Sequence, residues 1–293
     1  MSATTVELVC DAKAELGEGP LWDYRRGLLY WVDIAGKVIH IYDPIADRDR
    51  TIEAGQEVGC LALRSNGGLI FAGRNGFAEV DLESGAIADV LDPERHLPDN
   101  RFNDGKCDAR GRFWAGTMNT RGQPNKGSLY CLYPDFSLRT LITGVSISNG
   151  IAWSADQKTM YYIDTPTREV VAFDFDPDAG DLSGRRAVIR IPDDKGKPDG
   201  MTMDTQGMLW VALYGGGAVT RWDPRDGKLL ATIEVPAPRV TSCAFAGLRM
   251  DELFITSARQ GLDPNDAAAY PHSGGLFRAR PGARGSHEPL FGG

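Results

Sequence analysis

Side chains that could bind a metal ion or a polar substrate recur at one position of an internal repeat. Counting back ten or eleven residues from the starts of six short apolar segments gives Glu18, Gly59, Asn103, Asn149, Asp199 and Ser242. Equivalent positions of a cyclic repeat converge in space, so oxygen-bearing side chains at these positions would gather into one site. Carboxylates and carboxamides are hard ligands, of the kind that Ca²⁺, Mg²⁺, Mn²⁺ or an open Zn²⁺ site uses.

Each of these residues also has a structural interpretation. Asn149-Gly150 is a common turn sequence, Asp199-Gly200 after a proline is another, and Glu18 between two glycines could be an ordinary loop carboxylate. The recurrence of all three at one position of the repeat favours a site over three unrelated turns. An ion bound there could catalyse a reaction, or it could only plug the channel and hold the repeats together.

The elements that must position these residues follow from the repeat itself. Its apolar segments are 40 to 49 residues apart and begin at Leu29, Leu69, Phe113, Met160, Leu209 and Leu253. This period, with four short strands and tight turns in each unit, is typical of propeller blades. The sequence therefore predicts an all-β, six-bladed β-propeller with a central metal site. One domain is expected over residues 1–293, closed by a strand near Val6–Cys10, whereas a β-sandwich or a pair of β-domains is the alternative.

The first strand of each predicted blade is expected to line the central channel. These strands are predicted to begin just after the polar residues, for example at Gly19, Ile151 and Met201. The polar residues would then lie in turns at the channel entrance, where all the blades meet.

The composition excludes several classes of partner. The net charge is −8 and no cluster of Lys and Arg is present, so no nucleic acid and no anionic membrane is expected as a partner. No stretch approaches the roughly 18 apolar residues of a membrane span, and the N-terminus lacks the pattern of a signal peptide. The five cysteines are scattered and odd in number, which is typical of reduced thiols. A cytoplasmic location is therefore predicted, and the oligomeric state is left open.

Arg101 adds a cation to the polar segment 98–105. An arginine there can grip a hydroxylated or carbonyl-bearing substrate, although a solvated salt bridge is an equal alternative. The four histidines lie away from the repeat position and no Gly-x-Ser-x-Gly motif is present. A histidine-rich zinc site and a serine nucleophile are therefore unsupported.

Eight short motifs resemble the gluconolactonase, regucalcin (senescence marker protein) and luciferin-regenerating enzyme family, in the family's order. They are 16–20 (LGEGP), 101–105 (RFNDG), 115–118 (AGTM), 147–150 (ISNG), 161–165 (YYIDT), 198–201 (PDGM), 241–243 (TSC) and 258–264 (ARQGLDP). The resemblance implies a six-bladed propeller with one catalytic divalent metal, held by Glu18, Asn149 and Asp199. It also implies that Arg101 and Asn103 contact the substrate. Bacterial members are mostly sugar lactonases, and the chain resembles those most.

The resulting hypothesis is metal-dependent hydrolysis of an aldonolactone to its aldonic acid, in pentose or hexose oxidation. A divalent ion (Ca, Zn, Mg, Mn or Fe) would polarise the lactone carbonyl, and Asp199 would activate the attacking water or serve only as a ligand. Residues 119–121 replace acidic residues that help vertebrate members to bind sugar, which leaves the preferred sugar lactone open. The alternatives are a propeller hydrolase of other esters or phosphoesters and a non-catalytic, calcium-binding propeller.

Overall fold

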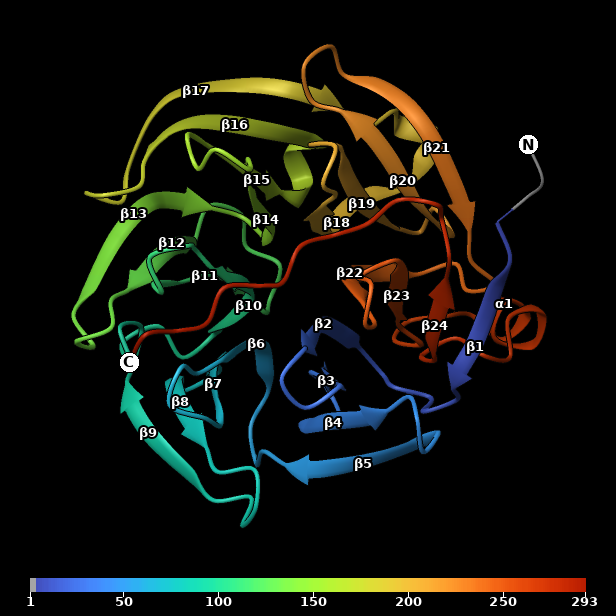
Figure 1. Cartoon of the computed structure of the whole chain (residues 1–293), viewed down its shortest axis with the longest axis horizontal. Helices are drawn as coiled ribbons and strands as arrows, with labels where there is room; N and C mark the ends of the chain where they lie inside the picture. The colour runs from blue at the N-terminus through green and yellow to red at the C-terminus, as the bar shows by residue number, and fades with distance from the viewer. Residues whose placement is uncertain (1–3) are drawn as a thin grey trace.

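Six four-stranded antiparallel sheets stand around a central axis in the computed structural model of the chain (Figure 1). The structure describes residues 4–293, and residues 1–3, at which the predicted domain begins, lie outside the described part. In five of the sheets the strands follow one another along the chain from the axis outward. The all-β fold and the six blades predicted from the repeat are confirmed.

The strands of the first three blades, from the axis outward, are β2 (Gly17–Asp23), β3 (Leu28–Asp33), β4 (Val38–Asp43) and β5 (Arg48–Glu53), then β6 (Val58–Leu63), β7 (Leu69–Gly73), β8 (Gly76–Val80) and β9 (Ile87–Leu91), then β10 (Asn100–Cys107), β11 (Phe113–Asn119), β12 (Gly127–Leu132) and β13 (Leu138–Val145). Those of the last three are β14 (Ser148–Trp153), β15 (Thr159–Asp164), β16 (Glu169–Asp176) and β17 (Asp181–Arg190), then β18 (Lys197–Met203), β19 (Leu209–Tyr214), β20 (Ala218–Asp223) and β21 (Lys228–Glu234), then β22 (Val240–Ala246), β23 (Glu252–Ser257), β24 (Leu276–Ala279) and β1 (Val6–Cys10). The short helices are η1 (Thr165–Thr167), η2 (Asp193–Lys195) and α1 (Pro264–Ala269). Over residues 4–293, no helix combines the length and the apolar content needed to cross a membrane.

The N-terminal strand closes the ring. β1 pairs antiparallel with β24, with Val6 opposite Ala279 and Leu8 opposite Phe277. The sixth blade therefore takes three strands from the end of the chain and its outermost strand from the beginning. The predicted closure at Val6–Cys10 is confirmed.

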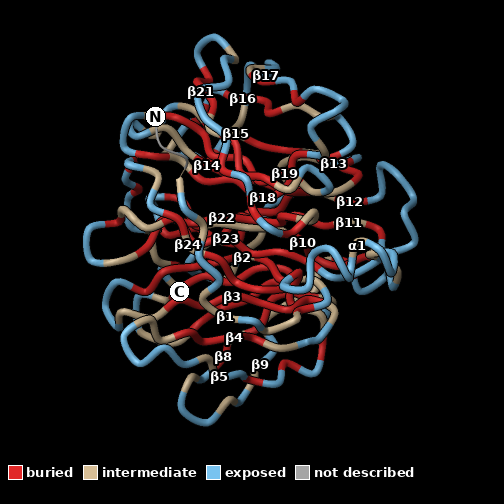
Figure 2. The backbone as a smooth tube through the Cα atoms, turned by 90° about the vertical axis from the view of Figure 1, so that its right-hand side faces the viewer, coloured by how far each residue is buried: buried red, intermediate tan, exposed pale blue. Residues whose placement is uncertain are grey.

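The core lies between neighbouring blades rather than within one of them. Each second strand carries one of the apolar segments of the repeat, and side chains such as Trp31, Trp114 and Trp210 are buried there. One apolar cluster joins Phe77 of the second blade to Phe113 of the third. The outermost strands face water (Figure 2). Adjacent blades therefore bury each other's faces, which holds the innermost strands around the axis.

Every innermost strand contains a β-bulge at the position that the repeat singles out. The register shifts lie at Glu18/Leu21, Val58/Cys60, Phe102/Asp104, Asn149/Ile151, Pro198/Met201 and Val240/Ser242. The prediction that these strands begin after the polar residues is wrong, since β2 begins at Gly17 and β18 at Lys197. The physical reason is that a glycine after a polar residue can mark a bulge inside a strand as well as a turn.

The C-terminal tail, defined here as residues 284–293, runs across the centre of the ring (Figure 1). It meets the ends of innermost strands, whereas the bulges lie near their starts. Gly285 forms a bridge with Asp204, just beyond β18, and the amide of Phe291 donates to the carbonyl of Leu63 at the end of β6, 2.7 Å away. Phe291 is fully buried between the second and third blades. The tail thus connects blades that lie on different sides of the axis.

We expect Phe291→Ala to lower the free energy of unfolding by about 3–5 kcal/mol, because it empties a filled apolar site and releases the tail. Denaturant-induced unfolding followed by tryptophan fluorescence would measure this change. Leu248→Ala is the matched control, because Leu248 is fully exposed and its truncation should change stability by no more than about 0.5 kcal/mol. Equal effects of the two substitutions would contradict the anchoring role of Phe291.

Candidate functional site

Three bulges bring the predicted metal ligands to the channel. Glu18 lies in β2, Asn149 in β14 and Asp199 in β18, and the three side chains are only 5%, 3% and 7% exposed. A bulge bends its strand and turns one side chain out of the regular alternation. The three residues, far apart in the sequence, therefore share one buried polar region at the start of the innermost strands.

Gly150 allows β14 to approach β18 closely enough for this arrangement. A Cβ atom at Gly150 would lie 2.6 Å from the Cβ of Met201 and 2.9 Å from the carbonyl oxygen of Asp199. No side chain fits in that space, so a larger residue would push the two bulges apart. The glycine after Asn149 is thus required by the approach of a neighbouring strand.

The Asn149 amide is oriented by its neighbours. Its Nδ2 donates a hydrogen bond of 2.8 Å to Oγ1 of Thr165, which in turn donates to the carbonyl of Pro198 at 2.9 Å. Its Oδ1 is buried and has no hydrogen-bond partner among residues 4–293. Since a buried amide oxygen normally has a partner, this atom is suited to a ligand. The residues present therefore fit a hard cation, which takes amide and carboxylate oxygens.

The carboxyl groups of the site disfavour one another's ionisation. Burial raises the pKa of Glu18 above its ordinary value, and repulsion from Asp199 and Asp104 raises it further. Burial likewise raises the pKa of Asp199, with Asp104 adding to the rise and the Asn149 amide opposing it. A cation among these groups would favour their charged forms.

Arg101 and Asn103 form one hydrogen-bonded unit beside the carboxylates. Nη1 of Arg101 donates to the carbonyl of Phe102 and to Oδ1 of Asn103, both at 2.8 Å. Nδ2 of Asn103 donates to the carbonyl of Ser148 at 2.7 Å, which joins the third blade to the fourth. The Arg101 side chain is only 6% exposed, so it is not the solvated surface cation of the alternative interpretation. Their roles in binding substrate stay predictions.

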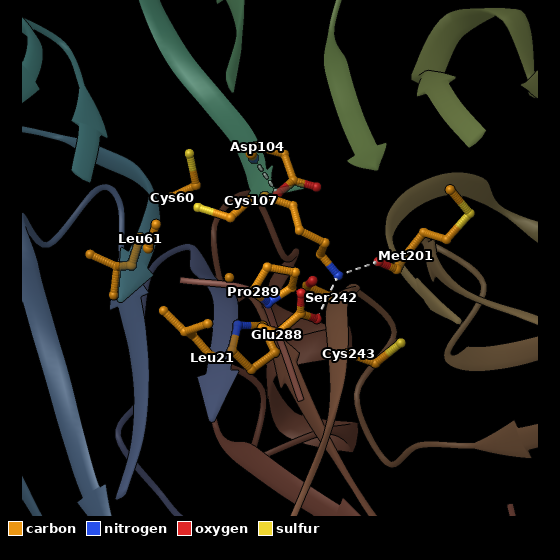
Figure 3. A pocket seen from close by; sticks show the side chains of 15 residues that line it. Leu21, Cys60, Leu61, Asp104, Cys107, Met201, Ser242, Cys243, Glu288 and Pro289 are labelled. Atoms are coloured by element: carbon orange, nitrogen blue, oxygen red, sulfur yellow. Dashed lines mark hydrogen bonds and ion pairs between the residues drawn. The ribbon is translucent and has the colours of Figure 1, made fainter. Parts of the chain in front are cut away.

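The remaining two repeat positions, Gly59 and Ser242, carry no charge. A Cβ atom at Gly59 would lie 2.5 Å from the carbonyl oxygen of Phe102, so the second blade has no room there for a side chain. Ser242 lines a cavity of about 30 Å³ deeper in the channel (Figure 3), which has room for about two water molecules. The six equivalent positions are therefore chemically unequal.

The same cavity is lined by three charged residues that were not predicted as site residues: Asp104, Lys106 and Glu288. Asp104 follows Asn103, and burial raises its pKa to about 6, against the opposing charge of Lys106. Glu288 reaches the cavity from the C-terminal tail and pairs with Lys106 at 3.0 Å. Asp104 and Lys106 could have been found from their strand alternation in β10. Glu288 lies outside every repeat, so no pattern in the sequence predicts its position.

The candidate site is not a metal site built from His, Cys, Asp and Glu side chains alone. Across residues 4–293, no group of three or more His, Cys, Asp or Glu side chains is gathered as a metal site. The predicted set depends instead on the Asn149 carboxamide as its third ligand. Such a set leaves positions for water and substrate, as a hydrolytic metal site requires.

Comparison with known proteins decides the family. Residues 16–259 match the SMP-30/Gluconolactonase/LRE-like region. The chain belongs to this family. It is 44% identical to YvrE of Bacillus subtilis (strain 168), provisionally named a sugar lactone lactonase, over 93% of this chain and 94% of that protein. Among solved structures, a luciferin-regenerating enzyme is 31% identical with a TM-score of 0.94, covering 99% of this chain and 100% of that one.

A second solved member of the family comes from Agrobacterium tumefaciens strain C58 and is described as a calcium-binding protein, regucalcin. It is 30% identical, with a TM-score of 0.93, and 99% of each chain is covered. The resemblance stated from the sequence motifs is thus confirmed.

We expect Glu18→Gln to stabilise the chelator-treated protein. The folded state holds the Glu18 proton more tightly than the unfolded chain does, so the cost of this carboxyl to folding grows as pH rises above its ordinary pKa of 4.5. The stabilisation should therefore be larger at pH 7 than at pH 5, as measured by thermal unfolding. Glu83→Gln, at an exposed glutamate, should have almost no effect at either pH. A Glu18→Gln effect that does not grow between these pH values would contradict this electrostatic description.

Proposed function

We propose that the chain hydrolyses a sugar lactone to the corresponding aldonic acid and that the reaction depends on one divalent metal ion. Membership of the gluconolactonase family supports the reaction class. The observation that carries the metal dependence is the buried, unpartnered Oδ1 of Asn149 beside two carboxylates whose pKa values are raised. Among the candidate ions, calcium is named in the description of the A. tumefaciens relative.

Glu18, Asn149 and Asp199 would hold the ion. When bound, a divalent ion supplies Lewis acidity, which polarises a lactone carbonyl and favours deprotonation of water. The protein contributes the fixed positions of three oxygen ligands, since the bulges and Gly150 leave them little freedom. Preorganised ligands lower the reorganisation needed as negative charge develops on the carbonyl oxygen.

Asp199 is proposed to accept a proton from the attacking water. Asp199 is buried in the same polar region as Glu18 and Asn149, and a carboxylate there can accept a proton from a neighbouring water molecule. Arg101 is proposed to donate hydrogen bonds to substrate oxygens, with Asn103 held in orientation by its bonds to Arg101 and Ser148. The proposed proton acceptor therefore lies in the fifth blade, and the proposed sugar-binding residues lie in the third.

The reaction is tested by acid release from glucono-, xylono-, arabino- and galactonolactones, with and without a chelator. We expect at least one lactone to be hydrolysed faster than its spontaneous rate, with activity lost to chelator and restored by a divalent ion. Asp199→Asn should lower kcat/KM by about 100-fold or more while the protein stays folded. Asp89→Asn, at an exposed position on β9, should retain wild-type activity.

The outcomes separate the alternatives. Hydrolysis of esters or phosphoesters without hydrolysis of any lactone would support a related hydrolase, and cation binding without any acid release would support a calcium-binding propeller. Near-wild-type turnover by Asp199→Asn would contradict the assignment of Asp199. The relative rates on the four sugars would identify the preferred lactone.

Arg101→Lys should raise KM about tenfold and change kcat less, because lysine keeps the charge but loses the planar guanidinium, whose Nη1 bonds both Phe102 and Asn103. Steady-state kinetics on the best lactone would measure both parameters. Arg186→Lys is the matched control, because the Arg186 side chain is 48% exposed and pairs with Asp174 at the surface. An unchanged KM for Arg101→Lys would count against a substrate role.

A further inference from the structure

Lys106 connects the C-terminal tail to the strand that carries Asp199. Its Nζ lies 3.0 Å from Oε1 of Glu288 and 3.3 Å from the carbonyl oxygen of Met201, and both contacts are drawn in Figure 3. The Lys106 and Glu288 side chains are 21% and 17% exposed. This ion pair is thus largely shielded from water, unlike the exposed pairs of the outer surface.

The contact on Met201 restrains the bulge of β18. The register shift of this strand runs from Pro198 to Met201, so Met201 is the residue at which regular pairing resumes after Asp199. The orientation of the Asp199 carboxylate depends on the backbone of this short bulge. A donor fixed on the Met201 carbonyl therefore limits how far the bulge can relax.

Glu288 is held in place from both sides. On one side of it, the amide of Gly285 donates to the carbonyl of Met250 at 2.8 Å. On the other side, the backbone of Phe291 bonds to Leu63 and Ser65 at 2.7 and 2.8 Å. The carboxylate therefore enters the channel from a segment that is anchored across the ring. This segment lies beyond residues 16–259, which define the family match.

We propose that Glu288 and Lys106 are positioning residues for the proposed metal centre. The C-terminal tail, at the other end of the channel, holds Glu288 in place for this role. The proposal rests on the proposed function, since it concerns the ligand Asp199. Glu288 fixes the Lys106 ammonium, the ammonium fixes the Met201 carbonyl, and the bulge then presents Asp199 beside Asn149. Neither residue touches the substrate or the ion.

Two effects of Glu288→Gln act in the same direction. The substitution loosens the anchor of Lys106, and it leaves an unbalanced positive charge in the channel, and both should weaken cation binding. Removing both partners in Lys106→Met/Glu288→Gln leaves the net charge unchanged. A loss of affinity in the double variant therefore cannot come from a change in the net charge of the channel.

The test is isothermal titration of the chelator-stripped chain of residues 1–293 with Ca²⁺ and, in parallel, with Mn²⁺. We expect both Glu288→Gln and the double variant to bind the ions about tenfold more weakly than the wild type. Arg64→Met is the matched control, because Arg64 donates to the tail at Gly293 and pairs with Glu79, but does not contact the channel pair. It should bind the ions like the wild type. Thermal unfolding of each variant would confirm that it is folded.

Wild-type affinity in Glu288→Gln would overturn the proposal. Restoration of affinity in the double variant would also overturn it, because the loss in Glu288→Gln would then come from the unbalanced charge alone. An equal loss in Arg64→Met would also overturn it, because general loosening of the tail would then explain the result. A wild type that binds neither ion would overturn the metal centre together with this inference. A wild type that binds ions but hydrolyses no lactone would overturn only the proposed reaction, since the affinities still test the positioning.

Discussion

The structure depends on the convergence of six innermost strands around one narrow axis. Each of these strands has a register shift near its start. Such a β-bulge turns one residue of the strand away from the regular alternation. Small residues complete the arrangement, since at Gly59 and Gly150 a single methyl group would meet the backbone or a side chain of the next blade.

This convergence has an electrostatic cost. Burial raises the pKa values of Glu18, Asp104 and Asp199, and the charge of Asp104 raises those of the other two further. The stability needed to keep them there comes from elsewhere, mainly from the aromatic and aliphatic side chains packed between blades. A cluster of like charges supported by an apolar framework is typical of a site built for a ligand rather than for stability.

The two ends of the chain contribute differently. The N-terminal strand β1 completes the sixth sheet through backbone pairing with β24, so the beginning and the end of the chain share one blade and close the ring. The C-terminal tail forms no strand of a blade, yet it crosses the channel and brings Glu288 to Lys106. The N-terminal end therefore completes the ring of blades, whereas the C-terminal end runs across the channel on the side away from the bulges.

The number of blades, the ring closure and the convergence of Glu18, Asn149 and Asp199 could all be predicted from the sequence, because they depend on a period that is visible in the residues. The strand starts at Gly17 and Lys197 could not, because Glu-Gly and Asp-Gly sequences fit a turn and a bulge equally well until neighbouring strands are present. The sequence also placed Arg101 near the site without deciding whether water or protein surrounds it. Only the tertiary structure joined it to Asn103, and only the tertiary structure brought Glu288 to Lys106. That contact links residues from unrelated parts of the chain, and no local pattern encodes it: it exists because the tail is anchored across the ring, at Gly285 on one side and Phe291 on the other.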